Sequence, residues 1–406
     1  MKILVVSRLF SGFAKPLREG QWPPAGAPAI YKLLEGLADD PEVELSVIFT
    51  AKDAETSERL GTERRKIAVP RLGIEAYVLD YRQSSALREG WHTAVILSHI
   101  LRAKPDLVYF TNANLVVASI AARLRLAKTV LRFMGLFPHE KRVADGGGRA
   151  LVRWLYRAPF SLALCTEEGS GGAVYLPRLL RSGVPLEVIL NGVDKPERKT
   201  TRAELLARYD LPEARPVVLF VGRLEFYKGA REFADGMLDL LRKTPDACTA
   251  VVVGEGTFRT DLEQISSLIE ADGGIFRLIG GIPHDEVLDW YRFSDIYVSL
   301  NMHGNLSNAN LEAIACGVCL ILPESDPKSS TDVITDSLIP DDAAIRLPRN
   351  DLPAALSRAL RELLSSKARQ EALRSALRQA APAIIRTWNA RIGYEIGRLK
   401  ELSSGA

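Results

Sequence analysis

The chain has 406 residues, 47% of them hydrophobic and 25% charged, with a formal net charge of +3. This length exceeds what one ordinary core supports, so we expect two domains. No uncharged apolar stretch reaches the roughly 18 residues that a membrane-spanning helix needs, and the apolar start at Ile3–Val6 is too short for a signal peptide. Four cysteines argue against a disulfide scaffold. We therefore expect a cytoplasmic protein.

The first half alternates apolar strand-like runs with helical segments. The loop Ser7–Pro28, rich in glycine and proline, precedes a helix predicted at Ala29–Ala38. Strands that alternate with helices predict parallel strands joined by crossovers. The predicted strands are Ile3–Val6, Val43–Phe49, Leu107–Phe110, Thr129–Phe133 and Leu162–Cys165.

The same rhythm restarts after the turn Asn191-Gly192-Val193-Asp194, which marks a domain boundary. Helices are predicted over Asp351–Gln379 and, after an interruption near Pro382, over Ile384–Leu402. The predicted domains are therefore residues 1–190, residues 191–380 and a final helix over 381–406. The predicted strands of this half are Val217–Val221, Ala250–Val253, Phe276–Ile279, Ile296–Leu300 and Val318–Leu322.

Two features of this half predict a site for a phosphorylated ligand. The strand Val217–Val221 ends at Gly222, and the cations Arg223 and Lys228 follow it in a strand-to-helix turn. Ser307 and Asn308 are candidate N-caps for the apolar helix that follows. The first-turn amides and the dipole of such a helix favour a diphosphate.

A metal site is not predicted. Cys316 and Cys319 form a CxxC, but no second Cys or His pair lies nearby, and the surrounding residues are apolar. Buried thiols are therefore the better interpretation. The sequence also contains no D-x-D triplet, which fits fixed cations and helix amides in the place of a metal.

Five blocks, in this order and spacing, resemble the retaining family-4 glycosyltransferases. The resemblance implies the GT-B fold, an α/β architecture of two Rossmann-like lobes facing a cleft. It also implies a C-terminal helix that crosses back to the N-terminal lobe. The first half matches by its opening strand, its glycine-rich loop and its strand rhythm. The five blocks are Asn191–Asp194, Phe220–Gly229, Val251–Gly256, Ile279–Leu300 and Ser307–Val318.

The resemblance also implies roles for individual residues. Arg223 and Lys228 would hold the diphosphate of a UDP- or GDP-linked sugar, and Glu312 would accept hydrogen bonds from the ribose hydroxyls. Ile282 and Pro283 would face the nucleobase. Gly12, in the loop after the first strand, would contact the donor phosphate or the acceptor. The implied donor site further includes Asn191, Gly222, Glu255, Ser307, Asn308, Ala309, Asn310 and Leu311.

The chain departs from the family in both halves. Eight residues before Glu312, where the family has a second glutamate that contacts the donor sugar, this chain has Gly304. His303 and Asn305 are candidate substitutes. In the first half, His139 lies a few residues later than the family's histidine near the reacting sugar. Arg132 is a second candidate contact, for an acceptor or a phosphate.

The sequence thus predicts a retaining glycosyltransferase of glycan or polysaccharide biosynthesis, with a sugar, a lipid-linked sugar or a small molecule as acceptor. No cofactor, metal or nucleic acid is expected. The alternatives are a GT-B epimerase or phosphorylase and, because of Gly304, a non-catalytic sugar-nucleotide-binding protein. A dehydrogenase is disfavoured because no GxGxxG turn follows the first strand. The basic, aromatic segment Arg149–Phe160 predicts either a solvated helix face or peripheral contact with an anionic membrane.

Overall fold

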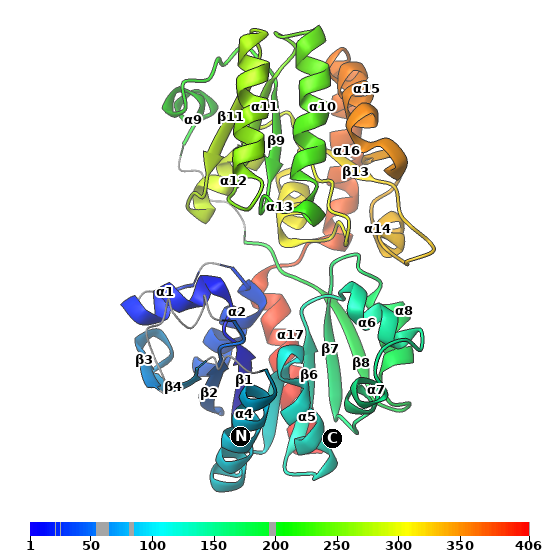
Figure 1. The fold of residues 1–406 in the computed structure, drawn as a ribbon. Coiled ribbons are helices and arrows are strands. Elements are labelled where there is room, and N and C mark those ends of the chain that lie inside the picture. The colour runs from blue at the N-terminus through cyan, green and yellow to red at the C-terminus, as the bar shows by residue number, and fades with distance from the viewer. Residues whose placement is uncertain (21, 25, 54–64, 81–84, 195–199, 406) are drawn as a thin grey trace. The chain divides into compact units, whose positions relative to one another are not determined.

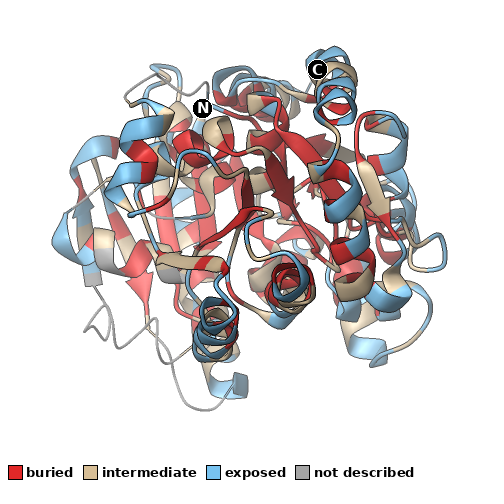
Figure 2. Ribbon diagram, turned by 90° about the horizontal axis from the view of Figure 1, so that it is seen from above, coloured by how far each residue is buried: buried red, intermediate tan, exposed pale blue. Residues whose placement is uncertain are grey.

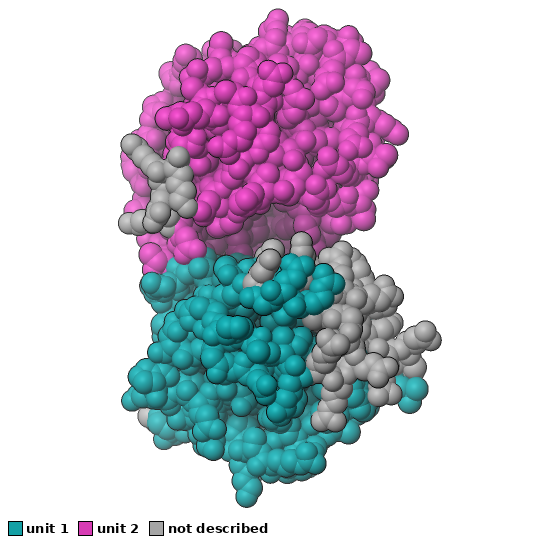
Figure 3. Space-filling model, turned by 90° about the vertical axis from the view of Figure 1, so that its left-hand side faces the viewer, with its two compact units in different colours: residues 1–167, 172–189, 388–406 teal, residues 168–171, 190–387 magenta. Residues whose placement is uncertain are grey.

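The computed structural model describes residues 1–20, 22–24, 26–53, 65–80, 85–194 and 200–405 (Figure 1). The chain divides into two compact units, coloured separately in Figure 3. Unit 1 comprises Met1–Glu167, Gly172–Ile189 and Trp388–Ala406. Unit 2 comprises Glu168–Gly171 and Leu190–Thr387. Each unit is built around a mainly parallel sheet with helices packed on it, so the predicted α/β fold class is confirmed.

Unit 1, over its described residues, holds an eight-stranded sheet of order β3-β4-β2-β1-β5-β6-β7-β8. β1 lies between β2 and β5 and is parallel to both, while β3 pairs antiparallel with β4 at one edge. The predicted strands of this half are confirmed, and β3, β4 and β8 are additional. The strands are β1 Lys2–Arg8, β2 Glu44–Thr50, β3 Arg65–Val69, β4 Ile74–Leu79, β5 Leu107–Thr111, β6 Lys128–Phe133, β7 Leu162–Glu167 and β8 Leu186–Leu190.

The α-helices of unit 1 cover both faces of this sheet (Figure 1). Their buried sides form two apolar cores, one on each face. Short 3-10 turns lie at Pro70–Leu72 and Asn112–Asn114. The helices are α1 Ser11–Glu19, α2 Pro28–Ala38, α4 Ser85–Ala103, α5 Leu115–Arg123, α6 Pro138–Ala144, α7 Ala150–Tyr156, α8 Gly172–Leu179 and α17 Trp388–Ser404.

Helix α1 corrects the prediction of a continuous loop over Ser7–Pro28. Phe13, Ala14 and Leu17 fall on one side of α1 and are buried in the core of unit 1. This apolar face forms a helix in spite of Pro16 because burial outweighs the local penalty of proline. Gly12 therefore lies inside a helix and not in a loop.

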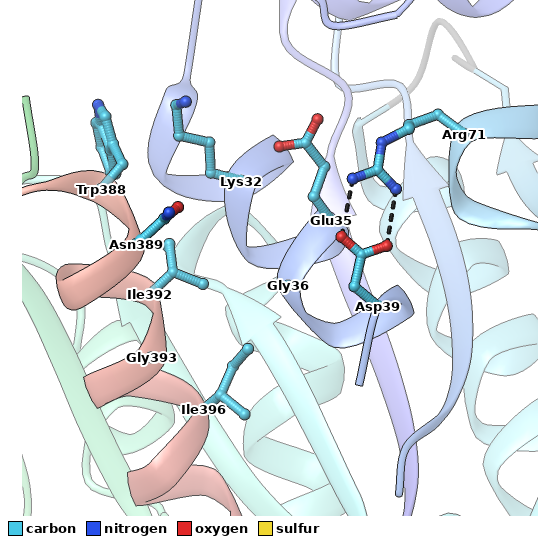
Figure 4. Close-up of a pocket in the computed structure, with 10 residues that line it drawn as sticks. All are labelled: Lys32, Glu35, Gly36, Asp39, Arg71, Trp388, Asn389, Ile392, Gly393 and Ile396. Atoms are coloured by element: carbon cyan, nitrogen blue, oxygen red, sulfur yellow. Dashed lines mark hydrogen bonds and ion pairs between the residues drawn. The ribbon is translucent and has the colours of Figure 1, made fainter. Parts of the chain in front are cut away.

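The last helix, α17, packs against α2 within unit 1. Trp388, Ile392, Ile396 and Leu399 from α17 belong to the core that α2 also enters. The helices approach closely at Gly36, where a side-chain Cβ would lie 2.8 Å from Ile392 Cγ2. A polar surface pocket lies beside this contact (Figure 4).

Unit 2, over its described residues, holds a six-stranded sheet of order β11-β10-β9-β12-β13-β14. Its recorded strand pairs are all parallel. The predicted strands are confirmed, with β14 in addition. The strands are β9 Val217–Val221, β10 Thr249–Val253, β11 Ile275–Gly280, β12 Ile296–Val298, β13 Cys319–Pro323 and β14 Ile345–Leu347.

The strand order of unit 2 reverses between β9 and β12. The chain runs outward from β9 through β10 to β11, returns, and then runs outward in the other direction from β12 through β13 to β14. The crevice at the carboxyl ends of strands at such a switch point is where open α/β sheets bind ligands. A ligand site is therefore expected at the carboxyl ends of β9 and β12.

The helices of unit 2 bury one side each and expose the other, as Figure 2 shows by colour for the chain as a whole. The predicted interruption near Pro382 is present but lies a few residues later, because α16 continues through this residue to Ile384 and α17 begins at Trp388. Short 3-10 turns lie at Phe226–Lys228 and Arg349–Asp351. The helices are α9 Arg202–Arg208, α10 Ala230–Lys243, α11 Arg259–Ala271, α12 His284–Phe293, α13 Asn308–Cys316, α14 Val333–Leu338, α15 Leu352–Leu364 and α16 Lys367–Ile384.

Candidate functional site

A small cavity lies at the switch point of the unit 2 sheet. The turn after β9, the end of β12 and the start of α13 all contribute to its wall. It therefore brings together several residues predicted for the diphosphate. Its lining includes Gly222, Lys228, Tyr297, Ser299, Asn301, Ser307, Ala309 and Asn310.

The two predicted cations both lie near the aromatic ring of Tyr227. Arg223 is exposed and donates a hydrogen bond to the Tyr227 hydroxyl, while the Lys228 Nζ lies 5.5 Å from the Tyr227 ring centroid. Burial lowers the pKa of Lys228, nearby Glu168 raises it, and Arg223 lowers it further. A partly desolvated ammonium beside a second cation is suited to bind an anion.

Tyr227 and His303 extend this arrangement. Their rings stack with centroids 5.3 Å apart, and the backbone N–H of Met302 donates to the carbonyl of Tyr227 at 2.8 Å. His303 is thus held beside the cations. Tyr227 lies within the motif that carries Arg223 and Lys228, but sequence reasoning assigned it no role.

Buried amide side chains order the start of α13. Asn310 accepts a hydrogen bond from the Tyr297 hydroxyl at 2.9 Å and donates to the Asn305 carbonyl at 3.0 Å. Asn301 donates to the Gly304 carbonyl at 2.7 Å. Ser307 is the N-cap residue, but its side chain makes no capping bond and lines the cavity instead. The first turn of α13 therefore faces the cavity on a rigid support.

This network corrects two predicted ligand contacts. Asn305 is fully buried, and its amide bonds to Asp332 at 2.7 Å and to the Asn301 carbonyl at 2.9 Å. The Leu311 side chain lies in the apolar core, and its N–H donates to Ser307 at 2.9 Å. Both residues support the site from within and do not present groups to a ligand.

Asp332 anchors the network from a distant part of the sequence. Its carboxylate accepts hydrogen bonds from the Asn305 backbone at 2.6 Å and from Thr335 at 2.8 Å, and it pairs with Arg349 at 3.1 Å. Burial raises the pKa of Asp332, and its bonds to Asn305, Thr335 and Arg349 oppose that rise. No local sequence pattern pointed to this residue, because its partner Asn305 lies 27 positions away.

Glu312 lies on α13, and Asn191 bonds to the first residue of the same helix. The Glu312 carboxylate is 2.9 Å from Nε2 of His284, and this hydrogen bond raises the pKa of His284. Asn191 donates to the Asn308 side chain at 2.7 Å. The predicted ribose contact thus lies on α13, and the predicted boundary residue is bonded to its first turn.

The remaining predicted residues of unit 2 follow neighbouring strands. Glu255, after β10, pairs with Arg259 at 2.9 Å and accepts from the N–H of Gly281 at 3.2 Å. It therefore ties the turn after β10 to the turn after β11. Ile282 and Pro283 lie just beyond, at the start of α12. Their predicted contact with a nucleobase stays a prediction.

In unit 1 the structure corrects the role of Arg132. Its side chain is completely buried and donates to Thr166 at 2.7 Å and to the Phe133 carbonyl at 2.9 Å. It also lies 4.0 Å from the buried carboxylate of Glu395 on α17. Arg132 therefore joins the sheet to the last helix and does not face a ligand.

His139, in contrast, is accessible. It stacks on Phe137 with centroids 6.2 Å apart, and its Nε2 lies 3.2 Å from the Glu140 carboxylate. Its side chain is 63% exposed, so it is free to meet an incoming molecule. A role in catalysis stays a prediction.

The charged side chains of the pocket between α2 and α17 are bonded within the protein and are not presented to a ligand. Arg71 and Asp39 satisfy each other through two hydrogen bonds of 2.9 and 2.8 Å (Figure 4). Glu35 accepts a hydrogen bond from Trp22 at 2.7 Å. The charges on its wall are thus engaged with the protein itself.

Helix α7 covers the centre of the segment predicted to meet a membrane. Leu155 and Tyr156 are buried, while Leu151 and Trp154 are exposed. The Arg123 guanidinium lies 3.8 Å from the Trp154 ring centroid. Part of the apolar side therefore belongs to the core of unit 1.

The described residues contain neither a candidate metal cluster nor a helix suited to cross a membrane. No group of three or more His, Cys, Asp or Glu side chains among them could hold a metal ion. None of their helices is both long and apolar enough to cross a bilayer. The thiols of Cys165, Cys248 and Cys319 are buried, and that of Cys316 is partly buried, where burial raises its pKa to about 12.

Comparisons with known proteins relate this chain to glycosyltransferases. Residues 215–366 match the family Glycosyl transferases group 1. A 2-deoxystreptamine N-acetyl-D-glucosaminyltransferase from Streptomyces fradiae is 29% identical over 315 residues, covering 75% of this chain and 70% of its own length. A lipopolysaccharide core biosynthesis mannosyltransferase from Rhizobium meliloti is 29% identical over 187 residues, covering 43% of this chain and 50% of its own length.

Solved structures resemble the whole chain. HepE from Anabaena, in complex with UDP, matches with a TM-score of 0.67 at 16% identity, over 99% of this chain and 100% of its own. Sucrose-phosphate synthase from Thermosynechococcus elongatus matches with a TM-score of 0.69 at 16% identity, over 99% and 100%. The fold is the GT-B fold of these enzymes. With the matched domain and the relatives named above, the chain is a glycosyltransferase.

Proposed function

We propose that this chain is a retaining glycosyltransferase that takes a sugar from a UDP- or GDP-linked donor held on unit 2. The observation that carries the proposal is the convergence of Lys228 and the first turn of α13 on one cavity at the switch point of the sheet. Arg223 adds a second cation through its bond to Tyr227. Two cations and a helix N-terminus are the groups that a diphosphate needs.

In the proposed reaction the bond between the anomeric carbon and the diphosphate oxygen breaks, and a bond to the acceptor oxygen forms. The acceptor hydroxyl proton passes to an oxygen of the departing diphosphate. Arg223, Lys228 and the α13 amides stabilise the negative charge that develops on that group. Because these donors are already in place, little reorganisation is needed when the bond breaks.

The comparisons support a nucleotide-sugar donor but leave its identity open. HepE was solved with UDP and with UDP-glucose, which favours a uridine nucleotide for this chain as well. The Streptomyces fradiae relative is named for transfer of N-acetylglucosamine to 2-deoxystreptamine, and the Rhizobium relative for a mannosyl transfer in lipopolysaccharide synthesis. The acceptor proposed here is a sugar, a lipid-linked sugar or a small polyol bound by unit 1.

A cytoplasmic location is part of the proposal and rests on the four free cysteines. Peripheral contact with an anionic membrane is proposed through α7, where Leu151 and Trp154 are 64% and 46% exposed. Cosedimentation of the full chain with anionic and with neutral liposomes tests this contact. Equal binding to the two would contradict it.

The test of the proposed function is a donor screen with the purified full chain. UDP-glucose, UDP-N-acetylglucosamine and GDP-mannose are each incubated with 2-deoxystreptamine and with simple sugars. Release of nucleoside diphosphate is measured, and proton NMR of the product gives its anomeric configuration. We expect one donor to be turned over with its anomeric configuration kept. An inverted product would refute retention, and conversion of the donor without an acceptor would indicate an epimerase.

A further inference from the structure

The segment Glu168–Gly171 packs beside the candidate donor site, although it directly follows a strand of unit 1. By its contacts it belongs to unit 2. The Glu168 carbonyl accepts a hydrogen bond from the N–H of Leu306 at 3.1 Å, and the Gly169 carbonyl accepts one from Asp332 at 2.7 Å. One backbone bond thus fixes this segment on the loop that leads into α13, and the other fixes it on the residue before α14.

The segment occupies the space that a side chain at position 304 would need. Gly304 has a φ of +146°, and a Cβ on it would overlap the Glu168 carbonyl oxygen and lie 2.7 Å from the Gly169 carbonyl carbon. Gly169 is equally confined, since its Cβ would lie 2.9 Å from the Asn305 nitrogen. Two glycines therefore allow the two backbones to approach each other closely.

The side chain that this approach brings to the site is a carboxylate. Glu168 is close enough to Lys228 to raise the pKa of that ammonium, against the effect of burial. Lys228 in turn lines the cavity at the start of α13. A carboxylate and the proposed diphosphate cation therefore share one corner of unit 2.

We infer that Glu168 binds hydroxyl groups of the donor sugar. The inference rests on the proposed function, because it places the sugar next to a diphosphate held by Lys228. An ionised carboxylate only accepts hydrogen bonds, so it suits the hydroxyls of a sugar. Gly304 has no side chain with which to do this, and the backbone of Glu168 fills its place. In this proposal the carboxylate that binds the sugar is that of Glu168, in the segment after β7.

The test compares nucleotide sugars with their parent diphosphates. Binding of UDP, UDP-glucose, GDP and GDP-mannose is measured by calorimetry for the wild-type chain, Glu168→Gln and Glu168→Ala. Glu225→Gln is the matched control, because Glu225 lies in the same loop as the cations and accepts instead from Thr257 at 3.1 Å. Circular dichroism checks that each variant is folded.

We expect both Glu168 variants to bind the nucleotide sugar roughly tenfold more weakly, as for the loss of one charged hydrogen bond. Their binding of the parent diphosphate should be no weaker than that of the wild type, and Glu225→Gln should bind all four probes like the wild type. An equal loss of affinity for the nucleotide sugar and for the parent diphosphate would overturn the inference. Glu168 would then affect the diphosphate site or the stability of the fold, and not the sugar. Unchanged binding of both would overturn it too. If the wild-type chain binds none of the four probes, the proposed function itself fails.

Discussion

At the scale of residues, the site depends on which polar groups are held by the protein and which are left to a ligand. The polar atoms of Asn305 and Asp332 are satisfied by hydrogen bonds within the protein. Lys228 lines the cavity, and the exposed Arg223 meets only the Tyr227 hydroxyl among the recorded hydrogen bonds of the described residues. The Glu312 carboxylate is partly satisfied, because it is hydrogen-bonded to His284. The cations are therefore the groups most available to a diphosphate.

The His284–Glu312 pair predicts a pH dependence of stability. The pKa of His284 in the folded protein lies above its ordinary value of 6.5. The stability that the His284–Glu312 pair contributes is therefore fully present below pH 6.5, and it is lost as the pH rises through the folded pKa. His284 is 55% exposed, so solvent screening limits the effect to a few tenths of a kcal/mol. Urea unfolding of wild type and His284→Gln should differ at pH 6 and converge at pH 9. A constant difference would contradict the pairing.

A second residue-scale prediction concerns the buried carboxylate of Glu395. Burial alone would raise its pKa, but Arg391 and Arg132 lower it overall. Arg391 pairs with Glu395 at 2.6 Å, and both side chains are completely buried. Glu395→Ala leaves buried guanidinium groups without their anion and should cost about 3–5 kcal/mol in the free energy of unfolding.

The matched control for this change is Glu401→Ala on the same helix. Glu401 pairs with Arg398 and is 56% exposed, so its loss should cost less than about 1 kcal/mol. Both values come from chemical denaturation monitored by circular dichroism. Similar losses for the two variants would show that the buried cluster does not stabilise unit 1.

At the scale of elements, the turn between β9 and α10 sets the position of the cations. Gly229 ends the 3-10 turn Phe226–Lys228 with a φ of +75° and begins α10. A Cβ there would lie 2.5 Å from the Leu300 carbonyl oxygen, just after β12. The turn after β9 therefore packs directly against the end of β12 at the point where the site forms.

Gly229→Ala tests this packing. It should destabilise the chain by about 2–4 kcal/mol, because it combines a left-handed backbone with a collision against Leu300. Gly273→Ala is the control: its φ is +82°, but its Cβ would come no nearer than 3.9 Å to Pro245. We expect it to cost about 1–2 kcal/mol, from the backbone alone. Equal losses in urea unfolding would refute the close approach of Gly229 and Leu300.

The sequence was informative where a pattern is local. β9, the cations after it and α13 were predicted because an apolar strand, a glycine and a capped helix each leave a signature within a few residues. Helix α1 was missed because Pro16 and the glycines around it resemble a loop, and the buried side of Phe13 and Leu17 is visible only in the fold.

The supporting residues of the site could not be predicted in the same way. Asp332 acts on Asn305 from a distant loop, and Glu168 reaches the site from the end of a strand in unit 1. Likewise the burial of Arg132 depends on Glu395, which lies on the last helix. These contacts are set by the tertiary fold, so no short window of sequence contains them.

At the scale of the whole molecule, the chain crosses between units more than once. Residues 168–171 join unit 2 before the chain returns to unit 1 at Gly172, and α17 joins unit 1 after unit 2 is complete. Unit 1 therefore needs the end of the chain for its core, through Trp388, Ile392 and Leu399. Neither unit corresponds to one continuous piece of sequence.

Truncation of the chain tests this dependence. A chain that ends at Thr387 lacks α17, and unit 1 should then lose its cooperative thermal transition. A chain that ends at Ser404 keeps α17 and should unfold like the wild type. Calorimetry on both chains distinguishes the outcomes. An unchanged transition after loss of α17 would contradict its place in the core.

The most direct test of the central claim is the affinity for a nucleoside diphosphate. UDP and GDP are titrated by calorimetry into the wild-type chain, the double variant Arg223→Ala/Lys228→Ala, and Arg231→Ala. Arg231 is the control, because it lies on α10 and pairs with Asp235 at 2.9 Å. We predict that one of the two nucleotides binds the wild type and the control equally. The double variant should bind it roughly a hundredfold more weakly, as expected for the loss of two charged donors. Equal affinity in all three proteins would contradict the assignment of the diphosphate site to the turn after β9.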